Sequence, residues 1–201
     1  MNLLYLGDAL DHWKGSLLER LQHAKLLTGL AADAMASDAQ DWTPPDWQLF
    51  STLLRLTPSQ ILTHSAQLPT HRDEYLREIT HPSDLFLDPD TGIATGYVAN
   101  RSQYLTASEL HALLGAHPAR VVGVYQHIRA ITTRRRLTQI MSIVSGVGAP
   151  FCCCSYESST VAMLFFSRDP SRIEAIHQHH AALLGRHAPD RTHLWHYDQA
   201  A

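Results

Sequence analysis

Short apolar runs mark the strands that the sequence predicts. The run Val121–Tyr125 is apolar throughout, as is typical of a strand buried on both faces of a sheet. Two runs joined by Glu157-Ser158-Ser159 most simply form a hairpin. The predicted strands are Leu3–Leu6, a second run over Leu26–Ala32 that ends at Asp33, Leu85–Leu87, Val121–Tyr125, Phe151–Tyr156 and Thr160–Phe166.

Segments with apolar residues at helical spacing lie between these runs. The first follows Gly7-Asp8 and places Leu17, Leu18 and Leu21 on its buried face, with Lys14 largely off that face. Two later helices carry clear start signals. In one, Thr106 can cap the first turn while Glu109 bonds back to it. In the other, Pro170 follows Asp169 at the first helical position, and the helix runs to about Leu184.

Strands that alternate with helices predict an α/β fold with a mostly parallel sheet and helices on both faces. The closing hairpin adds antiparallel strands at one edge. We find no internal repeat and no low-complexity stretch, so the prediction is one domain over residues 1–201. In such sheets, ligands bind at the carboxyl ends of the parallel strands.

Composition narrows the functional classes. The chain has 201 residues, of which 45% are hydrophobic and 17% charged, as in ordinary globular proteins. A net charge of −3 argues against a protein that coats nucleic acid, although Arg134-Arg135-Arg136 can hold a phosphate. No apolar run reaches the roughly 18 residues that a membrane span requires, and the N-terminus shows no leader pattern. We therefore expect a cytoplasmic protein without a membrane partner.

The three cysteines are consecutive, Cys152-Cys153-Cys154. Consecutive residues of a strand point to alternate faces, so the three thiols cannot ligate one metal ion. A disulfide between neighbours is strained. The pattern favours free, buried thiols on a strand.

Asp88 and Asp90 are the strongest candidates for chemistry. Both follow the short buried strand Leu85–Leu87, and Pro89 between them restricts the chain. Two carboxylates this close suit a divalent metal, or a base beside a hydrogen-bond acceptor. The segment Asp88-Pro89-Asp90-Thr91-Gly92 is also favourable turn chemistry, and that simpler interpretation stays open.

Further candidates follow from the positions of other polar residues. His127 ends the next strand, where it can act as acid, base or ligand, and Arg129 can meet an anionic substrate. Gly7 and Asp8 follow the first predicted strand, and Asp33 ends the second, where an acid can hold ribose hydroxyls. Tyr104, Glu109 and Lys14 are weaker candidates. The 14 histidines include no set spaced for zinc, and His177, His179 and His180 fit a solvated helix face.

Two resemblances rest on these motifs. The stretch Asp84–Gly92, followed by Val124-Tyr125-Gln126-His127, resembles an uncharacterised family of bacterial and phage proteins. The order strand-Asp-Pro-Asp, helix, strand, helix, hairpin resembles the second half of Rossmann-type S-adenosylmethionine methyltransferases. Members of that class that act on nucleic acid carry Asp-Pro-Pro-aromatic after their fourth strand. Here Asp90 and Thr91 replace the second proline and the aromatic residue, and the glycine-rich cofactor loop is absent.

The leading hypothesis is an enzyme of methyltransferase-like fold that acts on nucleic acid or a nucleotide, with Asp88, Asp90, His127 and Arg129 as catalytic candidates. This resemblance implies S-adenosylmethionine as cofactor, held by the three residues Gly7, Asp8 and Asp33. One alternative is a nuclease or phosphohydrolase in which Asp88 and Asp90 hold Mg²⁺ or Mn²⁺. Another is a non-catalytic binding module on a degenerate methyltransferase-like fold.

Overall fold

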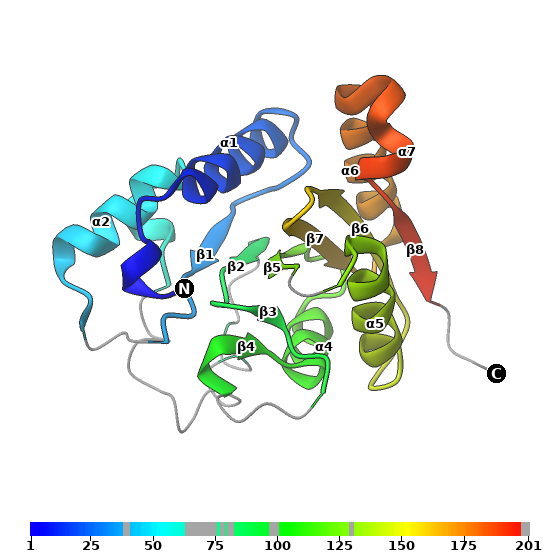
Figure 1. Cartoon of the computed structure of the whole chain (residues 1–201), viewed down its shortest axis with the longest axis horizontal. Helices are drawn as coiled ribbons and strands as arrows, with labels where there is room; N and C mark the ends of the chain where they lie inside the picture. Colours follow the sequence, from blue (N-terminus) through cyan, green and yellow to red (C-terminus); the bar gives the residue numbers. More distant parts are fainter. Residues whose placement is uncertain are drawn as a thin grey trace.

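A computed structural model describes residues 1–37, 41–62, 76, 79, 83–96, 101–128 and 131–197. Its centre is a six-stranded sheet in the order β1-β2-β5-β7-β6-β8 (Figure 1). The second, smaller sheet pairs β3 with β4. The strands are β1 (Ala31–Asp33), β2 (Leu85–Leu87), β3 (Gly92–Ile93), β4 (Tyr104–Leu105), β5 (Val122–His127), β6 (Phe151–Glu157), β7 (Val161–Ser167) and β8 (Leu194–Tyr197).

The main sheet is mixed. β1, β2 and β5 are parallel neighbours, whereas the β5–β7, β6–β7 and β6–β8 pairs are antiparallel. The prediction of a mostly parallel sheet is therefore wrong. The predicted hairpin β6–β7 is confirmed, but β7 lies beside β5 and a further strand, β8, extends the sheet beyond β6. The three strands β6, β7 and β8 make up half of the six-stranded sheet, and each is longer than β1 or β2.

Helices cover both faces of the sheet, as predicted. α1 (Ala9–His23), α2 (Pro44–Leu53) and α6 (Pro170–Leu184) contribute apolar side chains to one buried cluster. α4 (Ala107–Ala116) and α5 (Thr133–Ser145) contribute to the cluster on the other face. The short helix α7 (Ala188–Arg191) precedes β8. No described helix is both long enough and apolar enough to cross a lipid bilayer.

The predicted starts of two helices are confirmed. The Thr106 side chain accepts a hydrogen bond from the Glu109 N–H at 3.2 Å, and Glu109 accepts one from the Thr106 N–H at 2.7 Å. Asp169 caps α6 through the Ser171 N–H at 3.0 Å, with Pro170 at the first helical position. These signals are local in sequence, so they act without tertiary contacts.

The first predicted strand is wrong. Leu3–Tyr5 forms a turn of 3-10 helix, η1, and the Asn2 side chain accepts a hydrogen bond from the Leu4 N–H at 2.9 Å. Leu4 is 81% exposed, whereas Leu3 and Leu6 are partly buried against one apolar cluster. Asp8 consequently follows no strand and instead caps α1, accepting hydrogen bonds from the Leu10 and Asp11 N–H groups.

The cysteine prediction is confirmed for position and burial. All three thiols lie on β6 and are buried. Cys153 belongs to one apolar cluster, and Cys152 and Cys154 belong to the other. The alternation follows from the period of two along a strand.

Candidate functional site

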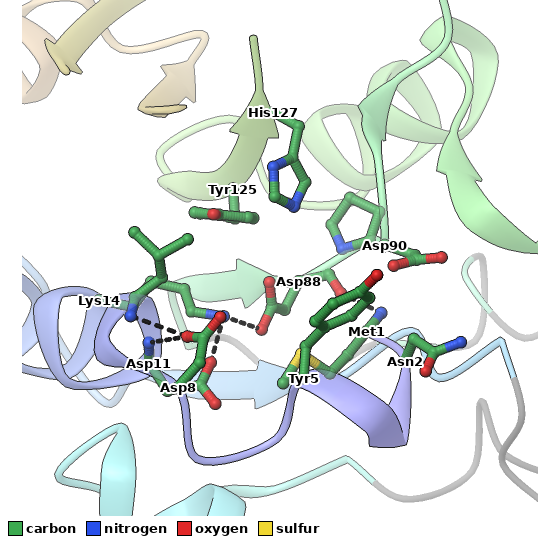
Figure 2. A pocket seen from close by; sticks show the side chains of 12 residues that line it. Met1, Asn2, Tyr5, Asp8, Asp11, Lys14, Asp88, Asp90, Tyr125 and His127 are labelled. Atoms are coloured by element: carbon green, nitrogen blue, oxygen red, sulfur yellow. Dashed lines mark hydrogen bonds and ion pairs between the residues drawn. The ribbon is translucent and has the colours of Figure 1, made fainter. Parts of the chain in front are cut away.

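A pocket of about 250 Å³ lies where β2 and β5 end, against η1 and the start of α1 (Figure 2). The structure thereby brings together four of the predicted site residues, Asp8, Asp88, Asp90 and His127. Their shared pocket is the predicted arrangement, although their roles stay predictions. The pocket is lined by Met1, Asn2, Tyr5, Asp8, Leu10, Asp11, Lys14, Asp88, Pro89, Asp90, Tyr125 and His127.

Asp88 lies at the base of this pocket. It follows β2 directly, is 1% exposed, and its backbone N–H donates to the Asp33 carbonyl at 3.0 Å. Its carboxylate accepts a hydrogen bond from Lys14 at Oδ2, 2.6 Å away. Figure 2 shows the other carboxylate oxygen turned toward the side of the pocket where Tyr125 and His127 lie. This second oxygen accepts no hydrogen bond from a side chain of the described residues.

The carboxylate of Asp84, at the other end of β2, accepts hydrogen bonds at both of its oxygens. Its two oxygens accept hydrogen bonds from the guanidinium of Arg172 at 2.8 and 2.7 Å. They also accept the N–H groups of Thr28, at 2.7 Å, and Val121, at 2.9 Å. Asp88 has a single side-chain donor within the described part of the chain. The contrast shows that the Asp84 carboxylate is taken up by bonds that hold the fold, whereas the Asp88 carboxylate has fewer partners.

Lys14 holds Asp88 from the side of α1. Its ammonium lies 2.6 Å from Asp88 Oδ2 and 2.6 Å from Asp11 Oδ1, and it sits 4.6 Å from the centroid of the Tyr125 ring. An ammonium has three N–H groups, so two carboxylates and one π face occupy it fully. Burial acts to lower the pKa of Lys14, but the carboxylates of Asp88 and Asp11 outweigh burial and raise it. Lys14 is therefore charged and fixed in place.

Lys14 is more buried than the sequence pattern predicts. The pattern predicts Lys14 largely off the buried face of the first helix, whereas the residue is 2% exposed. The signal was present: Lys14 is four residues from Leu10 and Leu18 and three from Leu17, which puts it on the apolar stripe. A lysine in such a stripe is buried only when it is paired.

Asp11 and Gly7 complete the start of α1. Asp11 Oδ2 accepts a hydrogen bond from the Gly7 N–H at 2.8 Å, and Gly7 has a φ of 93°. Burial raises the pKa of Asp11, while Lys14 and this backbone bond oppose the rise. Gly7, a predicted cofactor residue, does not line the pocket. Its position supports the capping turn of the helix.

Asp90 lies at the mouth of the pocket and is half-buried. No hydrogen bond or ion pair joins its carboxylate to another residue in the described ranges, and Figure 2 shows the carboxylate separate from the Lys14 cluster. The backbone after it is held firmly. The Gln126 side chain accepts the Ile93 N–H at 2.7 Å and donates to the Thr91 carbonyl at 3.2 Å. The Gln126 side chain therefore holds the turn that positions Asp90, and the Asp90 carboxylate is not needed for that purpose.

Gly92 is required in that turn. Its φ is 113°, a conformation that residues with a Cβ rarely adopt. A Cβ at this position would also collide with the amide of Gln126. The Asp-Pro-Asp-Thr-Gly segment is therefore a specific turn that also carries two pocket carboxylates, and the two interpretations of the motif are compatible.

Tyr125 and His127 line the pocket from β5. They are two residues apart and therefore share a face of the strand. Their ring centroids are 4.9 Å apart with an interplanar angle of 83°. The His127 N–H donates to the Thr91 carbonyl at 3.1 Å, which ties the end of β5 to the turn after Asp90.

Two further predicted residues fall outside this arrangement. Asp33 ends β1 and is fully buried, and its carboxylate accepts the Met35 N–H at 2.7 Å, in a turn where Met35 has a φ of 44°. Asp33 does not line the pocket. Arg129 lies outside the described residues. Two weaker candidates, Tyr104 on β4 and Glu109 in the cap of α4, are not pocket residues either.

The nitrogen of Met1 also reaches the site, which the sequence did not suggest. It donates to the carbonyl groups of Ala34 at 2.9 Å, Met35 at 3.2 Å and Asp88 at 2.6 Å. Burial lowers the pKa of this amino group to about 6, although the nearby Asp88 and Asp90 oppose the shift. These contacts connect the first residue with the ends of β1 and β2.

The pocket is acidic. Its lining includes four carboxylates, Asp8, Asp11, Asp88 and Asp90, against the ammonium of Lys14. Lys14 neutralises part of this negative charge at the base of the pocket, whereas the carboxylate of Asp90 lies at the mouth, away from Lys14. Within the described ranges, no three His, Cys, Asp or Glu side chains are grouped to hold a metal ion. The arrangement is suited to ligands with N–H donors or positive charge.

Comparisons with known proteins do not assign a family. No family model matches the chain, and no curated protein matches it. Among solved structures, the chain is similar to the crystal structure of protein LPL1258 from Legionella pneumophila str. Philadelphia 1, which carries the family label DUF519. The two chains are 12% identical, the match covers 96% of this chain and 97% of that one, and the TM-score is 0.41.

Proposed function

We propose that the pocket binds the amino group of a planar nitrogen heterocycle, such as a nucleobase, in an enzyme of methyltransferase-like fold that acts on nucleic acid or a nucleotide. The observation that carries this proposal is the state of Asp88. One carboxylate oxygen is held by Lys14, 2.6 Å away, and the other is turned toward the pocket. An amino group can donate to that second oxygen without displacing any existing bond.

The charge of the pocket favours such a ligand over a phosphate. Two unit charges 4 Å apart interact by about 4 kcal/mol at the effective dielectric of a protein surface. A phosphate near Asp88 and Asp90 would be repelled by amounts of this order, because Lys14 is the lining side chain that brings a permanent positive charge against the carboxylates. A ligand that presents N–H groups, or a positively charged sulfonium, is attracted by the same field.

Aromatic side chains around the pocket suit a flat ring. Tyr5 on η1 is 52% exposed and lines the same pocket as Asp90 (Figure 2). In the methyltransferases that the motif resembles, an aromatic residue stands where this chain has Thr91. We propose that Tyr5 and His127 supply the ring surface instead. The volume of about 250 Å³ lies just below the usual range of small-molecule pockets, about 300–1,000 Å³, so it fits one ring system.

The parallel part of the sheet supports the fold assignment. β1, β2 and β5 are parallel neighbours, and the pocket lies at their carboxyl ends, where α/β folds bind ligands. The predicted order of strand, Asp-Pro-Asp, helix, strand, helix and hairpin is present as β2, α4, β5, α5 and β6–β7. We propose the Rossmann-like assignment for this part of the molecule.

The chemistry follows from which atoms are held and which are available. Lys14 orients the Asp88 carboxylate, so Asp88 can accept an N–H of the target amine and fix its direction. S-adenosylmethionine would supply the methyl group as an electrophile, and its positive sulfonium suits the acidic pocket. The amine must lose a proton after transfer, and the half-buried Asp90 carboxylate can accept that proton and pass it to water.

Of the predicted cofactor residues Gly7, Asp8 and Asp33, Asp8 lines the pocket and the other two do not. The Gly7 N–H is bonded to Asp11, and one oxygen of Asp33 is bonded to its own turn. Asp8 lines the pocket while capping α1 through Oδ1. Of the three, Asp8 is the residue we propose to contact a positively charged group of the cofactor.

Isothermal titration with adenosine and with purine riboside, which lacks the amino group, tests the proposal. Adenosine should bind about tenfold more tightly, since an unmatched buried acceptor costs about 1–3 kcal/mol. Asp88→Asn should remove the preference, whereas Asp190→Asn, at an exposed position on α7, should keep it. Equal affinities in the wild type would contradict the proposed ligand. A separate titration with S-adenosylmethionine tests the reaction class, and no binding at millimolar concentration would exclude it.

A metal-dependent nuclease or phosphohydrolase is the second candidate, and the available carboxylate of Asp90 favours it. Lys14 counts against it, because an ammonium 2.6 Å from Asp88 Oδ2 occupies a position that a divalent cation would need. Incubation of DNA and RNA with Mn²⁺ discriminates. Cleavage that is lost in both Asp88→Asn and Asp90→Asn would support this alternative over methyl transfer.

A binding module without catalysis is the third candidate. It predicts the preference for adenosine over purine riboside but no methyl transfer to any tested nucleic acid. The departures at Asp90 and Thr91 from the methyltransferase motif favour it.

A further inference from the structure

Cys152, His196 and Glu174 form a second constellation, away from the pocket. Cys152 Sγ lies 3.2 Å from His196 Nδ1, and His196 Nε2 lies 3.8 Å from Glu174 Oε1. The three side chains come from β6, β8 and α6. The fold positions the first two directly, because Cys152 and His196 are register partners in the antiparallel β6–β8 pair. Neighbouring Phe151 and Tyr197, the next register pair, stack with ring centroids 5.1 Å apart.

We propose that this constellation makes Cys152 a reactive thiol that exchanges with small disulfides. An imidazole in contact with a thiol accepts its proton and stabilises the resulting thiolate, which is the nucleophilic form. Glu174 faces the opposite ring nitrogen, where it stabilises the imidazolium. The unit combines a nucleophile, a base and an orienting carboxylate.

The other two cysteines provide an internal comparison. Cys153 and Cys154 are fully buried, and burial raises the pKa of both thiols, so they stay protonated and unreactive. Cys152 differs in exposure as well as in its partner. It is 8% exposed, and the side chains of His196 and Glu174 are 42% and 47% exposed. β8 is the edge strand, so the constellation borders solvent.

The step is a thiol–disulfide exchange. The Cys152 proton moves to His196, and the thiolate attacks one sulfur of the disulfide. The old S–S bond breaks as the new one forms, and the leaving thiolate takes up the proton. The products are a mixed disulfide at Cys152 and one free small thiol, and a second thiol reverses the reaction. Because Cys152 lies beneath α6 and β8, the added group should also loosen the edge strand.

Dithiobis(nitrobenzoate) tests the proposal, since each exchange releases one coloured thiolate. The native wild type should release one equivalent in a fast phase, and mass mapping should locate the adduct on Cys152. Cys152→Ala should lose the fast phase, whereas Cys154→Ala should keep it. His196→Gln should slow the fast phase about tenfold at neutral pH and move the midpoint of its pH profile upward. Glu174→Gln should move that midpoint upward by a smaller amount, with a smaller loss of rate, because the imidazolium loses the carboxylate that stabilises it.

The outcomes are distinguishable. A wild type without a fast phase, or an adduct mapped to Cys153 or Cys154, would overturn the proposal. A His196→Gln variant with an unchanged rate and pH profile would show that the thiol is merely accessible, and would overturn the role of the imidazole. The mapping uses the wild type, so it decides the matter even if Cys152→Ala fails to fold.

Discussion

The ammonium of Lys14 lies 2.6 Å from the carboxylate of Asp88, although 74 residues separate them in the chain. This contact joins α1 to the end of β2 and places a permanent charge beneath the pocket. Asp11 shares the same ammonium at 2.6 Å. Fold stability and the state of the candidate catalytic carboxylate therefore depend on one side chain.

Lys14→Met should destabilise the protein strongly. The change leaves Asp11 and Asp88 buried without their cation, and breaking a buried pair typically costs about 3–5 kcal/mol. Chemical denaturation measures the free energy of unfolding. Arg20→Met, at an exposed position of the same helix, is the matched control and should lie within about 0.5 kcal/mol of wild type. Similar values for the two variants would contradict the role assigned to Lys14.

The contribution of Lys14 should depend on pH in the alkaline range. The folded-state pKa of Lys14 is raised above its ordinary value of 10.5. A raised pKa of a cation stabilises the folded state fully below the ordinary value, and this stabilisation is lost as pH rises through the folded value. The difference in unfolding free energy between wild type and Lys14→Met should therefore be constant near pH 8–9 and shrink above about 10.5. If the difference in unfolding free energy grows over that interval, the pKa of Lys14 is not raised in the folded state.

Asp90→Asn should melt at or above the wild-type temperature while losing the activity of the site. Its carboxylate bonds to no side chain in the described part of the chain, and it lies among other acids that repel it. Asp46→Asn is the contrasting control, because Asp46 accepts two hydrogen bonds from Thr43 at the start of α2. That control should melt below wild type, because it weakens these two hydrogen bonds. If Asp90→Asn instead melts well below wild type, the main role of Asp90 is to stabilise the turn.

Gly92→Ala and Gln126→Ala should be coupled. The alanine at position 92 is strained at a φ of 113° and its Cβ meets the Gln126 amide. Removing that amide relieves the collision but not the backbone strain, so Gly92→Ala should cost less in the Gln126→Ala background. We expect a coupling of about 0.5–3 kcal/mol in a double-mutant cycle of unfolding free energies. Additive effects would show that the two residues do not brace the turn together.

The sequence predicted those elements that depend on interactions between residues close together in the chain. The capping pair Thr106–Glu109, the Asp169-Pro170 start and the β6–β7 hairpin involve residues close together in sequence, and all three are present. The same holds for the turn after Asp88, where Pro89 restricts the backbone and Gly92 permits a positive φ. The strand end that carries Asp88 was also predictable, since a carboxylate after a buried run marks the edge of a sheet.

Tertiary structure decided the rest, because partners distant in sequence determine it. Leu3–Tyr5 has the composition of a strand but pairs with no strand in the described ranges, and it forms a 3-10 turn beside the pocket. The direction of β7 depends on which strand the hairpin joins, and β5 accepts it in antiparallel register. Lys14 acquires its role only when α1 packs over β2 and β5. A buried charge is stable only beside its counter-charge, and here that counter-charge lies 74 residues away.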